Sequence, residues 1–317
     1  MEITLRGIEI GGLQVRFYSM MILLGLFVGI LLAQRLAKRL GEDPAHAVNL
    51  AVVGAISGII GARLYHVFDQ QEWPRYRDSP ADIFAVWNGG IGIFGAVAGA
   101  ILGLVIYTHF RFGLRRFVSV PFDVPVLVRR RPAVSTLRWL DIGAPAFLLG
   151  QAIGRWGNYF NQELFGKPTD LPWAVTIPTD HVAREAPEFL GFNTFHPLFA
   201  YESLLNFLGV AVIVFLIYRF GSRLRSGDSL SMYLVWYPAV RFSLEFLRTD
   251  PWEQAGIPMA QIVSVAMFAF GAGSIAYRHL RATSEPEAML VLPVGEPPRS
   301  RSAERRRRRR PGQQRDA

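Results

Sequence analysis

Long stretches without charged side chains dominate this chain and set its predicted secondary structure. Seven of them occur, at residues 17–34, 45–62, 83–110, 142–154, 203–218, 229–240 and 254–277. Several reach the roughly 18–20 residues that an α-helix needs to cross the hydrocarbon core of a bilayer. The pattern therefore predicts an all-α integral membrane protein with seven transmembrane helices.

The shorter stretches reach spanning length once one charged residue within the membrane is allowed. Arg63, Arg155, Glu202 and Arg241 occupy such positions. A soluble protein with buried core helices is the alternative, but so little polar chain could not cover seven apolar helices. The first stretch also differs from a secretory signal peptide, because MEITLRGIEIGG before it is long and mixed in charge and no small-residue cleavage site follows. We expect it to be a retained span.

Positive charge is distributed unevenly around the predicted spans. Of the 34 lysines and arginines, most fall in residues 35–39, 109–138 and 219–228 and in the tail from Arg278. Cytoplasmic segments of membrane proteins carry such an excess. The distribution therefore predicts an N-terminus outside the cell and a C-terminus in the cytoplasm.

Two regions differ from the spans in composition. Residues 158–195 contain PTDLPWAVTIP, whose prolines and β-prone WAVTI predict a small ordered extracytoplasmic cap on a seven-span domain of residues 1–281. Residues 282–317 are rich in Pro, Glu, Ser and Arg, which predicts a disordered basic cytoplasmic tail. Its RRRRRR run raises nucleic-acid binding as an alternative. We favour an anionic membrane surface or a topology role, and expect no nucleic-acid partner.

Small residues recur at helical spacing in the second and third stretches. They are Gly54, Gly58, Gly61, Gly95, Gly99 and Gly103. Such stripes let two helices approach closely in lipid, so we interpret them as packing positions. The neighbouring WNGG (87–90) predicts irregular backbone at the outer end of the third span.

Polar residues gather at the predicted outer ends of several spans. Four lie at spacings of 4, 4 and 3, which places them in one stripe of a helix: Tyr237, Arg241, Glu245 and Arg248. The others are Tyr18, Arg63, Tyr65, Arg155, Asn158, Asn161, Glu163, His196, Tyr201 and Glu202. Ionisable residues at membrane depth are energetically unfavourable, and a functional site is the default hypothesis for them.

Two of these arginines favour an anionic ligand. Arg241 and Glu245 can neutralise each other as an i,i+4 pair, and Tyr18 and Tyr65 can belong to an interfacial aromatic belt. Carboxylates at this depth are nevertheless too few to neutralise both Arg155 and Arg241. Arginine binds phosphate through a bidentate fork. A cavity with two such forks that opens to lipid suits a phospholipid headgroup.

The segment GRWGNYFNQELFG (154–166), here called the signature segment, resembles the G-R-x-G-N-[FY]-x-N-x-E-x-x-G signature of prolipoprotein diacylglyceryl transferases. Further similar motifs follow in the family's order over most of residues 10–280: VRFYSMMILLG, GARLYHVF, WNGGIGIFGA, PTDLPWAV, HPLFAYE and RFSLEFLR. The resemblance implies a seven-span, multi-pass enzyme of the bacterial cytoplasmic membrane. It also implies transfer of the sn-1,2-diacylglyceryl group from phosphatidylglycerol to the lipobox cysteine of a preprolipoprotein, giving a thioether and glycerol 1-phosphate.

The resemblance implies roles for individual residues. Those expected to bind phosphatidylglycerol are Arg155, Asn158, Asn161, Gly166, Tyr237, Glu245 and Arg248. Those expected to be catalytic are Tyr18, Arg155, Glu163, His196 and Arg241. Two positions depart from the family pattern: Phe94 stands where well-studied members carry a histidine proposed as a base, and HPLFAYE (196–202) lacks the glutamine and leucine of HPxQLYE. The general base is therefore open, with His196 and Glu163 as candidates.

The absence of cysteine also bears on the chemistry. A nucleophilic thiol must belong to the substrate, because the chain has none. We expect no metal or other cofactor, because no His/Asp/Glu cluster has metal-ligand spacing. Two other classes of function stay open: an anion transporter, whose expected inverted repeat is not visible, and a lipid-binding scaffold that forms no product.

Overall fold

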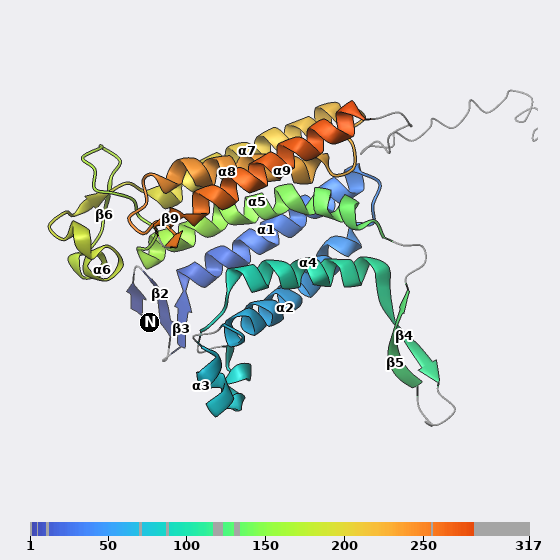
Figure 1. Ribbon diagram of the computed structural model, residues 1–317, viewed down its shortest axis with the longest axis horizontal. Coiled ribbons are helices and arrows are strands. Elements are labelled where there is room, and N and C mark those ends of the chain that lie inside the picture. The colour runs from blue at the N-terminus through green and yellow to red at the C-terminus, as the bar shows by residue number, and fades with distance from the viewer. Residues whose placement is uncertain are drawn as a thin grey trace, which may run out of the picture.

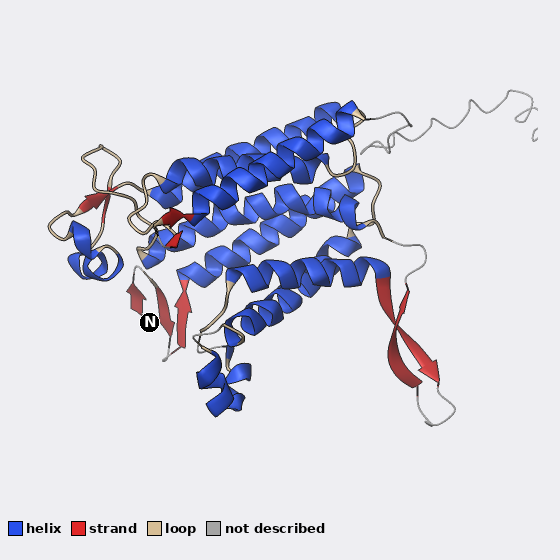
Figure 2. Cartoon of the chain, viewed as in Figure 1, coloured by secondary structure: helices blue, strands red, loops and turns tan. Residues whose placement is uncertain are grey.

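The computed structural model describes residues 2–4, 6–10, 13–69, 72–86, 89–116, 123–129, 134–254 and 256–281. Within them, seven helices of 17 residues or more lie over the seven predicted apolar stretches. They are α1 (Phe17–Arg39), α2 (Ala45–Val67), α4 (Ile93–His109), α5 (Thr136–Asn161), α7 (Leu198–Phe220), α8 (Asp228–Glu245) and α9 (Met259–Leu280). The predicted helical class is confirmed (Figure 2), and the predicted tail of residues 282–317 lies outside the described residues.

Four of these helices are long and apolar enough to cross a membrane: α1, α2, α7 and α9. Their outward faces carry large exposed apolar side chains, such as Phe27, Ile56, Phe215 and Phe270. Such extensive apolar exposure fits a lipid environment rather than water. The other three are α4, with 17 residues, and α5 and α8, which contain charged side chains toward their ends. The protein is thus an integral membrane protein by its helices, while seven spans and their orientation stay predictions.

The long helices form a five-helix bundle and a separate pair. α1, α5, α7, α8 and α9 pack together, whereas α2 and α4 pack mainly on each other and diverge from the bundle (Figure 1). The pair depends on glycine: a Cβ on Gly61 would lie 2.3 Å from the carbonyl oxygen of Gly95, and one on Gly99 would lie 2.2 Å from that of Ser57. The packing interpretation of the small-residue stripes is confirmed, except that Gly54 faces open space.

The N-terminus of α8 is fixed by a buried carboxylate of α5. Asp141 accepts hydrogen bonds from the backbone N–H groups of Gly227, at 2.5 Å, and Leu230, at 3.0 Å. A carboxylate at a helix N-terminus satisfies its free N–H groups and complements its dipole. This contact sets the register of α8 against α5, and so of the polar stripe at the other end of α8.

Short strands lie only at the ends of the helices (Figure 2). The N-terminal strands are β1 (Glu2–Thr4), β2 (Gly7–Ile10) and β3 (Leu13–Arg16); the others form the hairpin of β4 (Phe110–Arg116) with β5 (Asp123–Arg129), the pair β6 (Val175–Thr176) and β7 (Thr194–Phe195), and the pair β8 (Glu253–Gln254) and β9 (Ile257–Pro258). The hairpin β4–β5 lies at one end of the helices, and the remaining strands lie at the other (Figure 1). This separation agrees with the predicted division of loops between the two membrane faces.

Residues 162–195 form an ordered segment beyond the end of α5. A small apolar core of Phe165, Ile177, Val182, Ala186 and Phe195 holds it together. It also contains the short helices α6 (Thr179–Glu185) and η3 (Pro187–Phe189). The strand expected in WAVTI is confirmed as β6, and α5 runs to Asn161 before the segment begins.

Outside this segment, two connecting elements precede α4. They are the helices α3 (Trp73–Asp78) and η1 (Pro80–Phe84). The irregular backbone expected at WNGG is confirmed for Gly89 and Gly90, which have φ angles of 84° and 74°. Trp87 and Asn88 lie outside the described residues.

Candidate functional site

The signature segment begins in α5 and turns sharply after Asn161. Gln162 and Leu164 both adopt the left-handed region, with φ of 55° and 56°. Non-glycine residues in that region are uncommon and accompany functional sites. The turn directs Glu163 back toward α5, where its carboxylate accepts hydrogen bonds from Asn158 Nδ2 at 2.8 Å and Asn161 Nδ2 at 3.4 Å. Two asparagines of the signature therefore orient its glutamate.

Arg155 pairs with a carboxylate of α7. Its Nη2 lies 2.5 Å from Glu202 Oε1, and the two side chains are only 22% and 10% exposed. Tyr237 of α8 is a further hydrogen-bond partner of Arg155. Three helices thus meet at one guanidinium. A buried charge of this kind is tolerated because it is paired and hydrogen-bonded.

The polar stripe of α8 converges on a second buried carboxylate. Glu245 has 3% of its side chain exposed, forms an ion pair with Arg241, and lies 3.9 Å from Arg248 Nε through Oε2. Its Oε1 accepts a 3.1 Å hydrogen bond from the backbone N–H of Trp252. One carboxylate therefore faces two guanidinium groups. Because Arg155 and Arg241 each have a glutamate partner, the expectation that carboxylates are too few to pair both arginines is wrong.

Positive charge is in excess beside Arg248, which follows α8. Burial and the neighbouring Arg241 lower the pKa of the Arg248 guanidinium from its ordinary value, and Glu245 opposes this only in part. Arg155 contributes to the same lowering. An anion bound between these arginines would relieve the repulsion.

Gly166 joins the signature segment to two other parts of the chain. Its backbone forms a β-bridge with Arg248 on one side, and its N–H donates a 2.8 Å hydrogen bond to the carbonyl of His196 on the other. A Cβ here would lie 2.8 Å from the carbonyl oxygen of Leu247 and 2.9 Å from His196 Cβ. The structure therefore gives Gly166 a packing reason to be glycine.

His196 belongs to a short hydrogen-bonded chain with two aromatic residues. Its Nδ1 lies 3.2 Å from the hydroxyl of Tyr201, and that hydroxyl accepts a 2.7 Å hydrogen bond from Trp173 Nε1. Trp173 comes from the 162–195 segment and Tyr201 from α7. The chain therefore ties that segment to the start of α7.

Tyr18 of α1 is the last of the predicted site residues at this end of the bundle. Its ring packs so closely on Gly157 that a Cβ there would lie 2.9 Å from Tyr18 Cδ2. Tyr18 also interacts electrostatically with Glu163 and Arg155. The predicted site residues from α1, α5, α8 and the signature turn are therefore brought to the same end of the bundle.

Other intramembrane polar residues have structural partners. Arg63 donates to the backbone carbonyls of Ile83 at 2.9 Å, Gly89 at 2.6 Å and Gly90 at 2.9 Å, and also to that of Asp82. Arg63 is buried and stabilises the backbone of the segment before α4, so its charge is not free to bind a ligand. Phe94 packs on Trp252, with ring centroids 5.5 Å apart, and on Tyr65 at 6.1 Å.

Glu202 received no site role from the sequence, although it was recognised as an intramembrane carboxylate. Its partner Arg155 lies on a different helix, and one sequence holds no record of such a pairing. The available signal was its position in HPLFAYE, six residues after His196.

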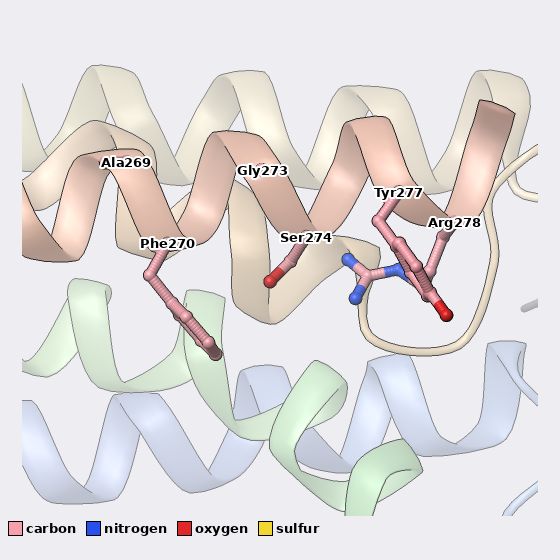
Figure 3. A pocket seen from close by; sticks show the side chains of 6 residues that line it. All are labelled: Ala269, Phe270, Gly273, Ser274, Tyr277 and Arg278. Carbon is pink, nitrogen blue, oxygen red and sulfur yellow. The ribbon is translucent and has the colours of Figure 1, made fainter. Parts of the chain in front are cut away.

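A shallow hollow on α9 lies far from this site. The side chains that line it project from one side of α9 (Figure 3). They include Phe270, Ser274, Tyr277 and Arg278. Arg278 is already bound, because its Nε donates to Asp228 Oδ1 at 3.0 Å, at the start of α8. The hollow thus holds no free charged group and is at the opposite end of α8 from Arg241.

Comparisons with known proteins identify the family. A sequence profile described as prolipoprotein diacylglyceryl transferase matches residues 7–277. The phosphatidylglycerol–prolipoprotein diacylglyceryl transferase of Synechococcus elongatus is 36% identical over 293 residues, covering 91% of this chain and 92% of the relative. Those of Gloeobacter violaceus and Chloroflexus aggregans are 37% and 38% identical, covering 88% and 79% of this chain and 94% and 81% of the relatives. The chain therefore belongs to the prolipoprotein diacylglyceryl transferase family.

Proposed function

We propose that this protein transfers the sn-1,2-diacylglyceryl group of phosphatidylglycerol to the cysteine thiol in the lipobox of a preprolipoprotein. The product is a thioether, and glycerol 1-phosphate leaves. The names of the relatives support the two substrates. The protein would act in the bacterial cytoplasmic membrane, with seven spans, the N-terminus outside and the site near the outer face.

The observation that carries the proposal is the balance of charge at the site. Arg155, Arg241 and Arg248 are accompanied by Glu202 and Glu245 as their ion-pair partners. Within these ion pairs the guanidinium groups outnumber the carboxylates by one, while the Glu163 carboxylate is held by Asn158 and Asn161 instead. A phosphodiester carries one negative charge and offers the acceptor oxygens that guanidinium groups bind.

The same arrangement suits the reaction. The substrate thiolate attacks the glycerol carbon that carries the phosphate, the C–S bond forms, and the C–O bond breaks with its electron pair leaving on glycerol 1-phosphate. Negative charge thus grows on the phosphate oxygen in the transition state. Arginines fixed in a site of low dielectric stabilise that charge without having to reorganise. Arg155 and Arg241 are the groups we assign to this task.

The remaining predicted residues would position the substrate. Tyr237 and Glu245 hold Arg155 and Arg241, and Arg248 would add a further headgroup contact. Asn158 and Asn161 orient Glu163, and Tyr18 interacts electrostatically with both Glu163 and Arg155. Phe94 cannot accept a proton, so Glu163 and His196 are the candidates for the base that removes the thiol proton.

The test uses phosphatidylglycerol labelled in its diacylglyceryl group, a lipobox peptide and membranes containing the protein. Arg155→Ala and Arg241→Ala should each lower the rate of transfer by on the order of 10²–10³. Arg184→Ala is the matched control, because that side chain is 57% exposed on α6. Transfer at the wild-type rate in both site variants would refute the phosphate site. Headgroup binding without product would favour the scaffold.

A further inference from the structure

The donors and acceptors around Tyr201 determine where His196 carries its proton. The indole N–H of Trp173 can only donate, so the Tyr201 oxygen is the acceptor in their 2.7 Å contact. The hydroxyl proton of Tyr201 is then directed at its other close partner, His196 Nδ1, 3.2 Å away. A neutral imidazole that accepts at Nδ1 carries its hydrogen at Nε2. This arrangement gives the Trp173 N–H, the Tyr201 hydroxyl and His196 Nδ1 each a partner.

The Nε2–H group of His196 is free to donate a hydrogen bond to a ligand. Within the described part of the chain, no protein group pairs with Nε2, so this hydrogen is available to a ligand. The backbone of Gly166 lies between those of His196 and Arg248 and contacts both. Two strand spacings of about 4.8 Å separate the outer backbones. The side chains of His196 and Arg248 therefore start from the two segments that flank Gly166, as a ligand shared between them would require.

We infer that His196 acts as a neutral hydrogen-bond donor to a phosphate oxygen of the bound lipid, and not as the base. Trp173 and Tyr201 are positioning residues that hold the donor tautomer. The inference rests on the proposed function for the identity of the ligand. The proton stays on Nε2 throughout, so the hydrogen bond strengthens as charge grows on the leaving phosphate. Glu163 is then left as the candidate base.

The tautomer is measured without any turnover. ¹⁵N-histidine labelling of the whole protein in detergent, with NMR, gives separate signals for protonated and bare ring nitrogens. The chain has six histidines, so the His196 signals are assigned by difference from His196→Gln. We expect a protonated Nε2 and a bare Nδ1 in the wild type. Tyr201→Phe should convert this to a mixture of tautomers, whereas Tyr277→Phe, on the far end of α9, should leave it unchanged. A protonated Nδ1 in the wild type overturns the inference.

Two substitutions separate a donor from a base. The side-chain NH₂ of a glutamine at this position can occupy the place of the histidine Nε2. The shorter side chain of asparagine places its NH₂ only where Nδ1 was. His196→Gln should therefore keep kcat within about tenfold of the wild type, and His196→Asn should lower it by roughly 10²-fold. Equal, severe losses in both variants would assign His196 as the base. His109→Gln, at the other end of the helices, is the control.

The failure of this inference differs from failure of the proposed function. If the wild-type protein transfers no label from phosphatidylglycerol, the function is wrong whatever the tautomer. A second outcome is that transfer proceeds while Trp173→Phe and Tyr201→Phe change neither the tautomer nor kcat. The proposed function is then supported, and the positioning roles of Trp173 and Tyr201 are refuted. We expect each of these two variants to lower kcat about tenfold, with KM changing less.

Discussion

Gly166→Ala tests whether the last glycine of the signature segment acts by packing or by contact with substrate. The added Cβ would lie 2.8 Å from the carbonyl oxygen of Leu247, 2.9 Å from His196 Cβ and 3.0 Å from Leu198 Cγ. All three distances are shorter than the 3.4 Å at which ordinary contact begins, and one neighbour is backbone. Overpacking of this kind lowers the free energy of unfolding by roughly 1–3 kcal/mol.

The displaced backbone also carries functional groups. Gly166 lies between Arg248 and His196, so the substitution should move both and lower kcat as well as stability. Chemical unfolding in detergent, followed by tryptophan fluorescence, measures the first effect. The lipid-transfer assay measures the second.

A matched control lies in the same signature segment. A Cβ on Gly154 meets no atom within 4 Å, and the residue is inside α5. Gly154→Ala should therefore leave stability unchanged or raise it by up to about 1 kcal/mol, because alanine favours a helix over glycine. If Gly166→Ala unfolds at the wild-type free energy but still loses activity, the packing argument is refuted and a direct substrate contact is favoured.

Three further predictions follow from other parts of the fold. Glu202→Gln leaves the buried charge of Arg155 without its carboxylate and should lower the free energy of unfolding by about 3–5 kcal/mol; wild-type stability would contradict the pairing. Arg63→Met leaves several carbonyls of the segment before α4 unpaired and should lower the same free energy by more than about 3 kcal/mol, measured by the same unfolding assay. Because the chain has no cysteine, Asp180→Cys should react with an impermeant maleimide on intact cells and Ser222→Cys only after permeabilisation; the reverse result would invert the predicted topology.

The helices were predictable because lipid imposes one simple requirement on them. A span must be about 20 residues long and almost free of charge, and that pattern is visible along the chain. The polar stripe of α8 was predictable for the same reason, because helical periodicity alone places Arg241, Glu245 and Arg248 together. Local rules sufficed wherever the partners lie on one helix.

Pairings between elements were not predictable. The ion pair of Arg155 with Glu202 joins α5 to α7, and the contacts of Arg63 depend on how the segment before α4 folds back. The hairpin β4–β5 was not predicted, because the arginines of residues 109–138 were interpreted only as a topology signal. For the two arginines the deciding contact depends on tertiary structure that a single sequence does not contain.

Phe94 shows how a departure from the family pattern can still fit the site. The side chain cannot take part in proton transfer, yet it lies against Trp252, whose backbone N–H is hydrogen-bonded to Glu245. Phe94 thus reaches the ion pair of Glu245 with Arg241 through Trp252, and an apolar ring there would lower the local dielectric constant. Coulombic attraction between a guanidinium and a phosphate grows as that constant falls. Phenylalanine at this position would therefore strengthen anion binding while leaving proton removal to another residue, and this agrees with a base located in the signature turn at Glu163.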